Sequence, residues 1–388
     1  MKPFEVFIIF LRLGLTSFGG PIAHLGYFRE EFVTKRKWLS DSAYADLVTL
    51  CQFLPGPASS QVGMAIGNLR AGTFGAILAW MGFTLPSAII LVLLGLGIAK
   101  FDVENLKWIH GLKVVAVAVV AQAILGMGKK LCPDRERVII AIITSLFILF
   151  IQSGFIQILS LVIAGIYGAF FMKTPSDLPQ EPLHIPRQSR GAFFLILFVS
   201  FLFFIPFLRS IYPMQGIKLF DSFYRSGALV FGGGHVVLPL LQAEIVQNGW
   251  VTNDLFMAGY GLANAVPGPL FSFAAYLGAV SNFEPNGWWG AFISLIAIFL
   301  PSFFLIIGTL PFWENIRRLP KVRESISGVN AAVVGLLLAA FYYPVWTSAI
   351  FSLKDFLLAA VGFLILEFFK APSWIVVFGT VIVSLLIY

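Results

Sequence analysis

Apolar residues fill most of this chain in long unbroken runs, and the lengths of these runs predict membrane-spanning helices. Nine runs occur, near residues 73–99, 107–128, 138–151, 155–172, 192–212, 289–311, 326–345, 350–369 and 372–388. A helix needs about 20 apolar residues to cross the hydrocarbon core of a bilayer, so the shorter runs are marginal. The pattern predicts an all-α polytopic membrane protein with nine candidate spans.

One strip interrupts this pattern, the polar and proline-rich KTPSDLPQEPLHIPRQSR from Lys173 to Arg190. Its composition is typical of a surface linker. We therefore expect three parts: an N-terminal repeat at 1–172, a linker with a connecting transmembrane helix at 173–213, and a C-terminal repeat at 214–388.

The two halves repeat each other in sequence. LRLGLTSFGG, which ends at Gly20, aligns with YRSGALVFGG, which ends at Gly233. Further matches follow in the same order: Glu31 with Glu244, Pro55-Gly56-Pro57 with Pro267-Gly268-Pro269, Pro86 with Pro301, and Gly111 with Gly328. The offset stays between 212 and 217, which indicates one ancestral unit used twice.

Loop charge predicts that the two copies face opposite sides of the membrane. The loop that holds Arg29, Lys35, Arg36 and Lys37 has a counterpart, Gln242 to Asp254, without any Lys or Arg. Cytoplasmic loops carry an excess of these residues. With the copies inverted, the inside loops hold 18 of the 26 Lys and Arg and the outside loops five. This assignment puts the N-terminus and the central linker in the cytoplasm.

The loop charges also predict re-entrant hairpins at 4–27 and 43–68, with counterparts in the second copy. The basic loops at 29–37 and 129–137 cannot lie on the same side if just one of these segments crosses fully, and neither segment reads as a clean span. The stretches on either side of Pro55-Gly56-Pro57 are each about a dozen residues, or roughly 18 Å of helix, against a hydrocarbon core of about 30 Å. Each stretch is therefore a half-helix. Broken helices persist at membrane depth where protein or a wet cavity satisfies the freed backbone groups, and in transporters they mark the substrate site.

The breaks are candidate anion sites. Pro57 and Pro269 suit the first turn of a new helix, whose free N–H groups and positive dipole end favour an anion. The substrate-binding candidates at and around the breaks are Gly19, Gly20, Gly232, Gly233, Gln52, Gly56, Pro57, Ala58, Ser59, Ser60, Asn264, Gly268, Pro269, Leu270, Phe271 and Ser272. Gln61 can add a further neutral donor. The alternative is that each break only kinks a packed helix.

Two matched arginines, Arg12 and Arg225, lie inside apolar segments. A charge there is costly unless it is paired or hydrated, so we expect both to give forked donors to a dianion. The alternative is that they pair with Glu31 or Glu244, or extend to the interface. Lys113 has no basic counterpart and is a weaker candidate.

Four groups are candidates for proton coupling. His24 and His235 follow the two Phe-Gly-Gly breaks, and the aligned acids Glu31 and Glu244 lie near hairpin ends. A structural role is open for each of them. The four histidines of the chain show no metal-ligand spacing.

Composition narrows the class of protein. With 59% hydrophobic residues, 12% charged residues and a mean hydropathy of +0.90, the chain cannot cover itself with a polar surface. The net charge of +7 therefore indicates membrane topology and no nucleic-acid partner. Two cysteines supply no disulfide framework, and neither a catalytic constellation, a metal site nor a cofactor motif is found. The opening segment reads as mature sequence rather than a signal peptide.

The motifs FGGP, QFLPGP, FGGGHVVLP and NAVPGP resemble the two motif sets of the chromate ion transporter family. The resemblance covers nearly the whole chain and is that of a long, two-domain member. It implies export of chromate, a tetrahedral dianion similar to sulfate, from the cytoplasm across a prokaryotic inner membrane. The first break reads Gly-Gly-Pro and the second Gly-Gly-Gly-His, so the two hairpins need not contact the substrate equally.

Two mechanisms fit these residues: a secondary active transporter with a midplane site, and a passive anion channel on the same scaffold. The expected partners are a chromate-like or sulfate-like oxyanion and the lipid bilayer. The sequence leaves open the choice of oxyanion, the coupling ion and the oligomeric state, with a homodimer among the options.

Overall fold

The computed structural model describes residues 3–98, 107–151, 153–173, 190–316 and 319–388. Within these ranges the regular structure is helical. Most of the expected linker, residues 174–189, lies outside them. The helices of the first half and the connecting helix are α1 Pro3–Thr16, α2 Gly20–Arg29, η1 Glu30–Lys35, α3 Asp41–Phe53, α4 Ala58–Ile98, α5 Lys107–Leu131, α6 Arg135–Phe150, α7 Gly154–Phe171 and α8 Gly191–Ile211.

The second half follows the same order of elements. Its helices are α9 Gln215–Leu229, η3 Gly234–Val236, α10 Val237–Leu241, η4 Gln242–Val246, α11 Asn253–Ala265, η5 Leu270–Ser272, α12 Phe273–Ala279, α13 Gly287–Thr309, η6 Leu310–Phe312, α14 Trp313–Ile316, α15 Pro320–Ala340, η7 Phe341–Trp346, α16 Leu353–Glu367 and α17 Ser373–Ile387.

Each of the nine apolar runs coincides with a helix. Five helical stretches are long and apolar enough to cross a membrane: Ala58–Ile98, Lys107–Leu131, Gly191–Ile211, Gly287–Ile316 and Pro320–Trp346. The helices at α6, α16 and α17 are shorter, at 16, 15 and 15 residues. The protein is therefore a polytopic, all-helical membrane protein.

Equivalent residues begin equivalent helices in the two halves. Ser40 accepts the Ala43 N–H at the start of α3, and Thr252 accepts the Leu255 N–H at the start of α11. A side-chain oxygen at this position satisfies an N–H group that has no partner within the helix. The aligned residues WLSD and WVTN thus fix the start of the same helix in both copies.

The chain folds back on itself inside α4. Ala71 and Gly72 leave helical geometry, and a Cβ on Gly67 would lie only 2.4 Å from the carbonyl oxygen of Gly75. Residues eight apart approach so closely only if the chain turns back between them. In the second copy, a Cβ on Gly278 would lie 2.2 Å from the Gly290 oxygen. Each half therefore packs a short helix closely against the longer helix that follows it.

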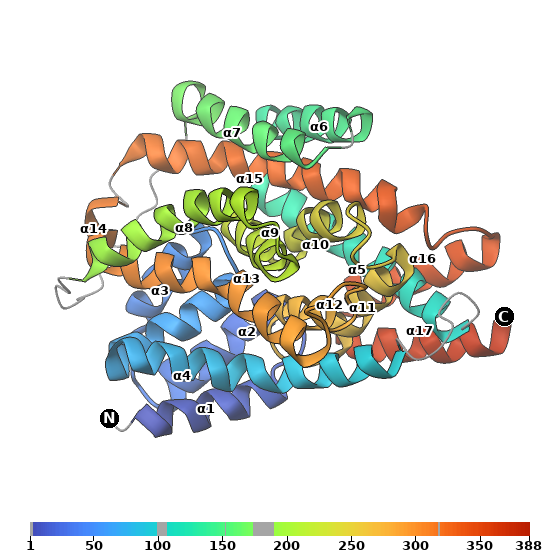
Figure 1. Cartoon of the computed structure of the whole chain (residues 1–388), viewed down its shortest axis with the longest axis horizontal. Helices are drawn as coiled ribbons and strands as arrows, with labels where there is room; N and C mark the ends of the chain where they lie inside the picture. Colours follow the sequence, from blue (N-terminus) through green and yellow to red (C-terminus); the bar gives the residue numbers. More distant parts are fainter. Residues whose placement is uncertain (1–2, 99–106, 152, 174–189, 317–318) are drawn as a thin grey trace.

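The two halves exchange helices at their far ends. In Figure 1, α6 and α7 lie along α15, while α16 and α17 pack against α5. Arg137 Nε donates to Ser327 Oγ over 2.8 Å on the first side. His110 Nε2 lies 2.6 Å from Asp355 Oδ1 on the second. His110 and Ser327 are aligned residues, and Arg137 and Asp355 each lie three residues after the N-cap of their helix, so each half completes the packing of the other.

Candidate functional site

Four interruptions in helical structure place backbone groups in the interior. They are Ser17–Gly19 between α1 and α2, Leu54–Pro57 between α3 and α4, Val230–Gly233 between α9 and η3, and Val266–Pro269 between α11 and η5. All four coincide with the glycine and proline motifs of the sequence. Gly56 has φ +122° and Gly268 has φ +105°, a conformation that residues with a side chain rarely adopt. The sequence prediction of broken helices at these motifs is confirmed.

The breaks of one half bind the breaks of the other. The Gly56 N–H donates to the Val230 carbonyl oxygen over 2.6 Å, and the Gly268 N–H donates to the Ser17 oxygen over 3.0 Å. Ser17 and Val230 are aligned residues, each directly before a Phe-Gly-Gly motif. The two hydrogen bonds are therefore related by exchange of the halves. Each Pro-Gly-Pro turn caps a carbonyl that the opposite broken helix leaves unpaired.

A serine from the opposite half covers each Pro-Gly-Pro turn. A Cβ on Gly56 would lie 2.1 Å from Ser302 Oγ, and a Cβ on Gly268 would lie 2.8 Å from Ser87 Oγ. Real Cβ atoms do not approach other atoms so closely, so both turns need glycine for space as well as for φ. These serines follow Pro86 and Pro301 directly in the chain.

His24 and Gly234 complete the junction of the four breaks. His24 lies 3.4 Å from Ser59 Oγ through Nδ1 and 3.2 Å from the Ser17 oxygen through Nε2. A Cβ on Gly234 would meet Pro21 at 3.4 Å and Leu270 at 3.8 Å. All four breaks are therefore neighbours, and we call their meeting point the break junction.

Free N–H groups remain at the break junction after the glycines are paired. The N–H groups of Ala58, Ser59 and Ser60 have no acceptor in the described part of the chain, and neither do those of Leu270 and Phe271. Four of these residues are buried; Ala58 is half-buried. Buried N–H groups at a helix start form a ready site for an anion. Pro57 and Pro269 lie one residue before these helices, slightly earlier than the sequence suggests.

Other predicted candidates have protein partners. Gln52 accepts from Lys130 Nζ over 3.2 Å, and Asn264 donates to the Tyr260 oxygen over 2.8 Å. The Ser272 hydroxyl donates to the Pro269 oxygen over 2.7 Å. Gly19, Gly20, Gly232 and Gly233 all have positive φ and form the tight turns of the two Phe-Gly-Gly breaks.

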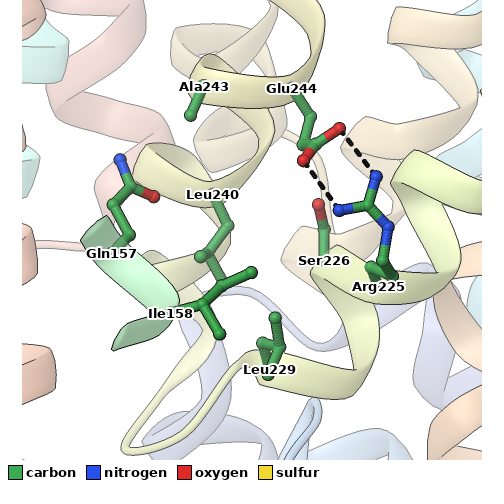
Figure 2. A pocket seen from close by; sticks show the side chains of 8 residues that line it. All are labelled: Gln157, Ile158, Arg225, Ser226, Leu229, Leu240, Ala243 and Glu244. Carbon is green, nitrogen blue, oxygen red and sulfur yellow. Dashed lines mark hydrogen bonds and ion pairs between the residues drawn. The ribbon is translucent and has the colours of Figure 1, made fainter. Parts of the chain in front are cut away.

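Arg225 is held by two carboxylates, those of Asp221 and Glu244, and Figure 2 shows the contacts with Glu244. Its guanidinium donates to Asp221 over 3.0 and 2.9 Å, and to Glu244 over 3.1 and 3.2 Å. Arg209 also donates to Asp221, over 2.7 Å, and Ser222 to Glu244, over 2.8 Å. The two arginines and two acids have no net charge. A pocket between α7, α9 and η4 lies beside this cluster and is lined by Gln157, Ile158, Arg225, Ser226, Leu229, Leu240, Ala243 and Glu244.

Arg12 differs from its matched arginine. Its side chain is exposed, and within the described residues it has no carboxylate partner. The position aligned with Asp221 is Ile8, and Glu31 binds Arg36 over 2.6 Å instead. Of the two matched arginines, Arg225 is therefore neutralised by acids, whereas Arg12 has no acid beside it in the described residues.

The remaining titratable candidates sit in separate places. His235 lies 2.7 Å from the Tyr260 hydroxyl and is half-buried. Lys113 forms an ion pair with Asp254 over 2.9 Å, between α5 and α11. Lys113 thus contributes to a contact between two helices.

Sequence reasoning missed Ser302, Ser87 and Asp221. The two serines could have been found, because each follows the proline of an aligned motif, FTLPS and IFLPS. Asp221 precedes Arg225 by four residues, the spacing that puts two side chains on one face of a helix. The carbonyl partners of the glycines had no signal in the sequence.

Comparison with known proteins shows which protein family the chain resembles over most of its length. A family described as "Chromate transporter" matches residues 4–169 and 217–385. A chromate transport protein from Cupriavidus metallidurans is 26% identical over 99% of this chain and 93% of its own length. A probable chromate transport protein from Synechococcus elongatus is 27% identical over 85% of this chain and 81% of its own. An uncharacterized transporter from Methanocaldococcus jannaschii is 28% identical over 86% of this chain and 82% of its own length. No solved structure was found to match.

Proposed function

Because the chain belongs to the chromate transporter family, we propose that it is a secondary active transporter that exports a tetrahedral oxyanion, chromate or its analogue sulfate. The names of the relatives from Cupriavidus and Synechococcus support chromate as the substrate. The proposed location is a prokaryotic inner membrane. Family membership also means that the protein is a transporter and not an enzyme.

The observation that carries the proposal is the break junction. Helix starts with unpaired, buried N–H groups at Ser59, Ser60 and Phe271 lie beside one another at broken helices. Each buried N–H group without a partner costs free energy, and an anion in the junction removes that cost. A tetrahedral oxyanion offers several acceptor oxygens to donors that approach from different elements. Broken helices that meet near the middle of inverted repeats are a recurring transporter site.

The proposed topology is two inverted repeats with re-entrant hairpins and a connecting span at α8. The reciprocal hydrogen bonds of Gly56 and Gly268 support it, because exchange of the halves reproduces both contacts. The charge of the loops supports a cytoplasmic N-terminus and linker. Movement of one repeat against the other would then open the junction to one side at a time.

Arg12 is the proposed cation of the pathway. It has no acid beside it in the described residues, so its field attracts a dianion without first breaking an ion pair. Arg225 would have to leave Asp221 and Glu244 before it could bind an anion. Protonation of Glu244 would loosen this hold in part, since Asp221 would remain. Glu31, His24 and His235 are the other proposed proton carriers.

Uphill flux in proteoliposomes tests the proposal. Purified protein is reconstituted with chromate inside and outside at equal concentration, and a proton gradient is imposed. A secondary transporter accumulates chromate on one side, and a protonophore abolishes the effect. With the membrane potential clamped at zero, a passive channel only dissipates a chromate gradient and never builds one, so that outcome would replace the transporter with the channel.

A further inference from the structure

The two halves differ in polarity at the break junction, although their backbones correspond. Five buried side chains that border it have a polar atom without a hydrogen-bond partner in the described structure: Ser17, Ser60, Gln61, Thr84 and Ser302. Four of them belong to the first repeat. Their aligned counterparts in the other repeat are Val230, Ser272, Phe273, Phe299 and Ser87.

None of these counterparts leaves a polar atom unpaired. Val230, Phe273 and Phe299 have apolar side chains. The Ser272 hydroxyl donates to the Pro269 oxygen over 2.7 Å, and the Ser87 hydroxyl to the Thr84 oxygen over 2.9 Å. Among these aligned positions, the unsatisfied polar side-chain atoms are therefore confined to one of two equivalent sets. Buried hydroxyls in proteins nearly always have partners, so such a set indicates a polar ligand.

Three of these groups surround the turn at Gly56. Ser302 Oγ lies over the turn, at 2.1 Å from the position of a Cβ on Gly56, and Gln61 Nε2 at 2.8 Å from it. Gln61 donates from Nε2 to the Pro55 oxygen over 2.7 Å, which holds the turn in place. Ser60 adds its free hydroxyl and free N–H one residue before Gln61. The unpaired atom of Gln61 is an acceptor, so it does not count among the donors for an anion.

We propose that the oxyanion binds one-sidedly, at the start of α4. The N–H groups of Ala58, Ser59 and Ser60 hold it from the first repeat, and the hydroxyl of Ser302 holds it from the second. The equivalent helix start at Leu270 lies among apolar side chains and supports the turn without binding the ligand. This assignment rests on the proposed function and specifies its site: a tetrahedral oxyanion whose oxygens accept from several neutral donors.

One matched pair of serines tests the assignment. Ser302→Ala removes a hydroxyl that the ligand uses, and Ser87→Ala removes its aligned counterpart. Kd for chromate is measured on both purified variants and the unmodified protein by equilibrium binding, with sulfate as a second probe. We expect Ser302→Ala to raise Kd about 10-fold or more, because a hydrogen bond to a charged group is lost. Ser87→Ala should change it by less than about twofold. Ser60→Ala should behave like Ser302→Ala.

Thermal unfolding without ligand gives a readout that a purely structural role would not produce. Removing a buried hydroxyl that lacks a partner relieves a cost, so Ser302→Ala should unfold at the same or a higher temperature without chromate. Its stabilisation by added chromate should nevertheless be smaller, because that stabilisation follows the affinity. Ser87→Ala loses a hydrogen bond and should keep the full chromate-induced shift.

The outcomes separate the site from the function. If the unmodified protein binds chromate and the two serine variants weaken it equally, or neither weakens it, the one-sided site is wrong and the transporter remains. If the unmodified protein neither binds nor transports chromate or sulfate, the proposed function fails, and the site fails with it.

Discussion

Replacing Gly56 by alanine separates a substrate-binding turn from a simple kink. If the turn were only a kink, the change would cost at most about 1 kcal/mol, since alanine is the better helix former. The structure predicts a larger loss of stability than this. At φ +122° a side chain adds backbone strain of about 1–3 kcal/mol. The new Cβ would also lie 2.1 Å from Ser302 Oγ and 2.8 Å from Gln61 Nε2, so both side chains must move.

Movement of these two side chains changes the site itself. Gln61 holds the turn through the Pro55 oxygen, and Ser302 lies over it. We therefore expect Gly56→Ala protein to insert and purify as a folded monodisperse species, with a lowered Tm and no measurable chromate transport. The assay is chromate flux in proteoliposomes at matched protein density.

Gly72→Ala is the control for backbone strain. Gly72 also has positive φ, at +65°, but a Cβ there has no atom within 4 Å. Its cost is strain alone, and it lies outside the break junction, so transport should persist. Wild-type flux from Gly56→Ala would refute the reasoning, and loss of flux from both variants would show that strain alone explains the effect.

Three further predictions concern charge and topology. Arg12→Ala should slow chromate uptake, most strongly at low ionic strength, because its field attracts the dianion, and Arg12→Lys should keep most of the rate; an unchanged rate at low salt would make Arg12 structural. Arg225→Ala should instead cost about 3 kcal/mol of stability, because Glu244 loses its cation and Asp221 keeps only Arg209; an unchanged unfolding free energy would contradict the ion-pair cluster. Cysteines introduced at Lys35 and Gly249 should label from opposite membrane sides, and equal labelling from one side would refute the inverted repeats. Burial raises the pKa of the Cys132 thiol to about 11, so little thiolate from this native cysteine competes at neutral pH.

Much of the fold follows from local sequence. All nine apolar runs form helices, because a run of apolar residues with few breakers has no other way to satisfy its backbone in a bilayer. The four breaks fall at glycine and proline motifs, since those residues permit or impose the turn. Alignment of the two copies also places the helix start at Leu270–Ser272 opposite the start of α4. The same alignment shows apolar residues, such as Phe273 and Phe299, where the first copy has Gln61 and Thr84.

The packing between halves was not predictable from the sequence. Gly328 and Gly335 of α15 allow backbones to approach closely, but nothing in the sequence specifies α6 and α7 as the helices that do so. The exchange of helices between halves depends on contacts more than a hundred residues apart, such as Arg137 with Ser327. The neutral state of the Arg225 cluster likewise depends on Arg209, which lies on a different helix.

The proposed oxyanion site lies where the four breaks meet. A structure with bound chromate, with chromium located by its anomalous scattering, tests it most directly. We expect one chromium peak at the start of α4, with its oxygens within hydrogen-bonding distance of the N–H groups of Ala58 to Ser60 and of the Ser302 hydroxyl. A peak beside Arg225 in the pocket of Figure 2, with the break junction closed by protein atoms, would contradict it.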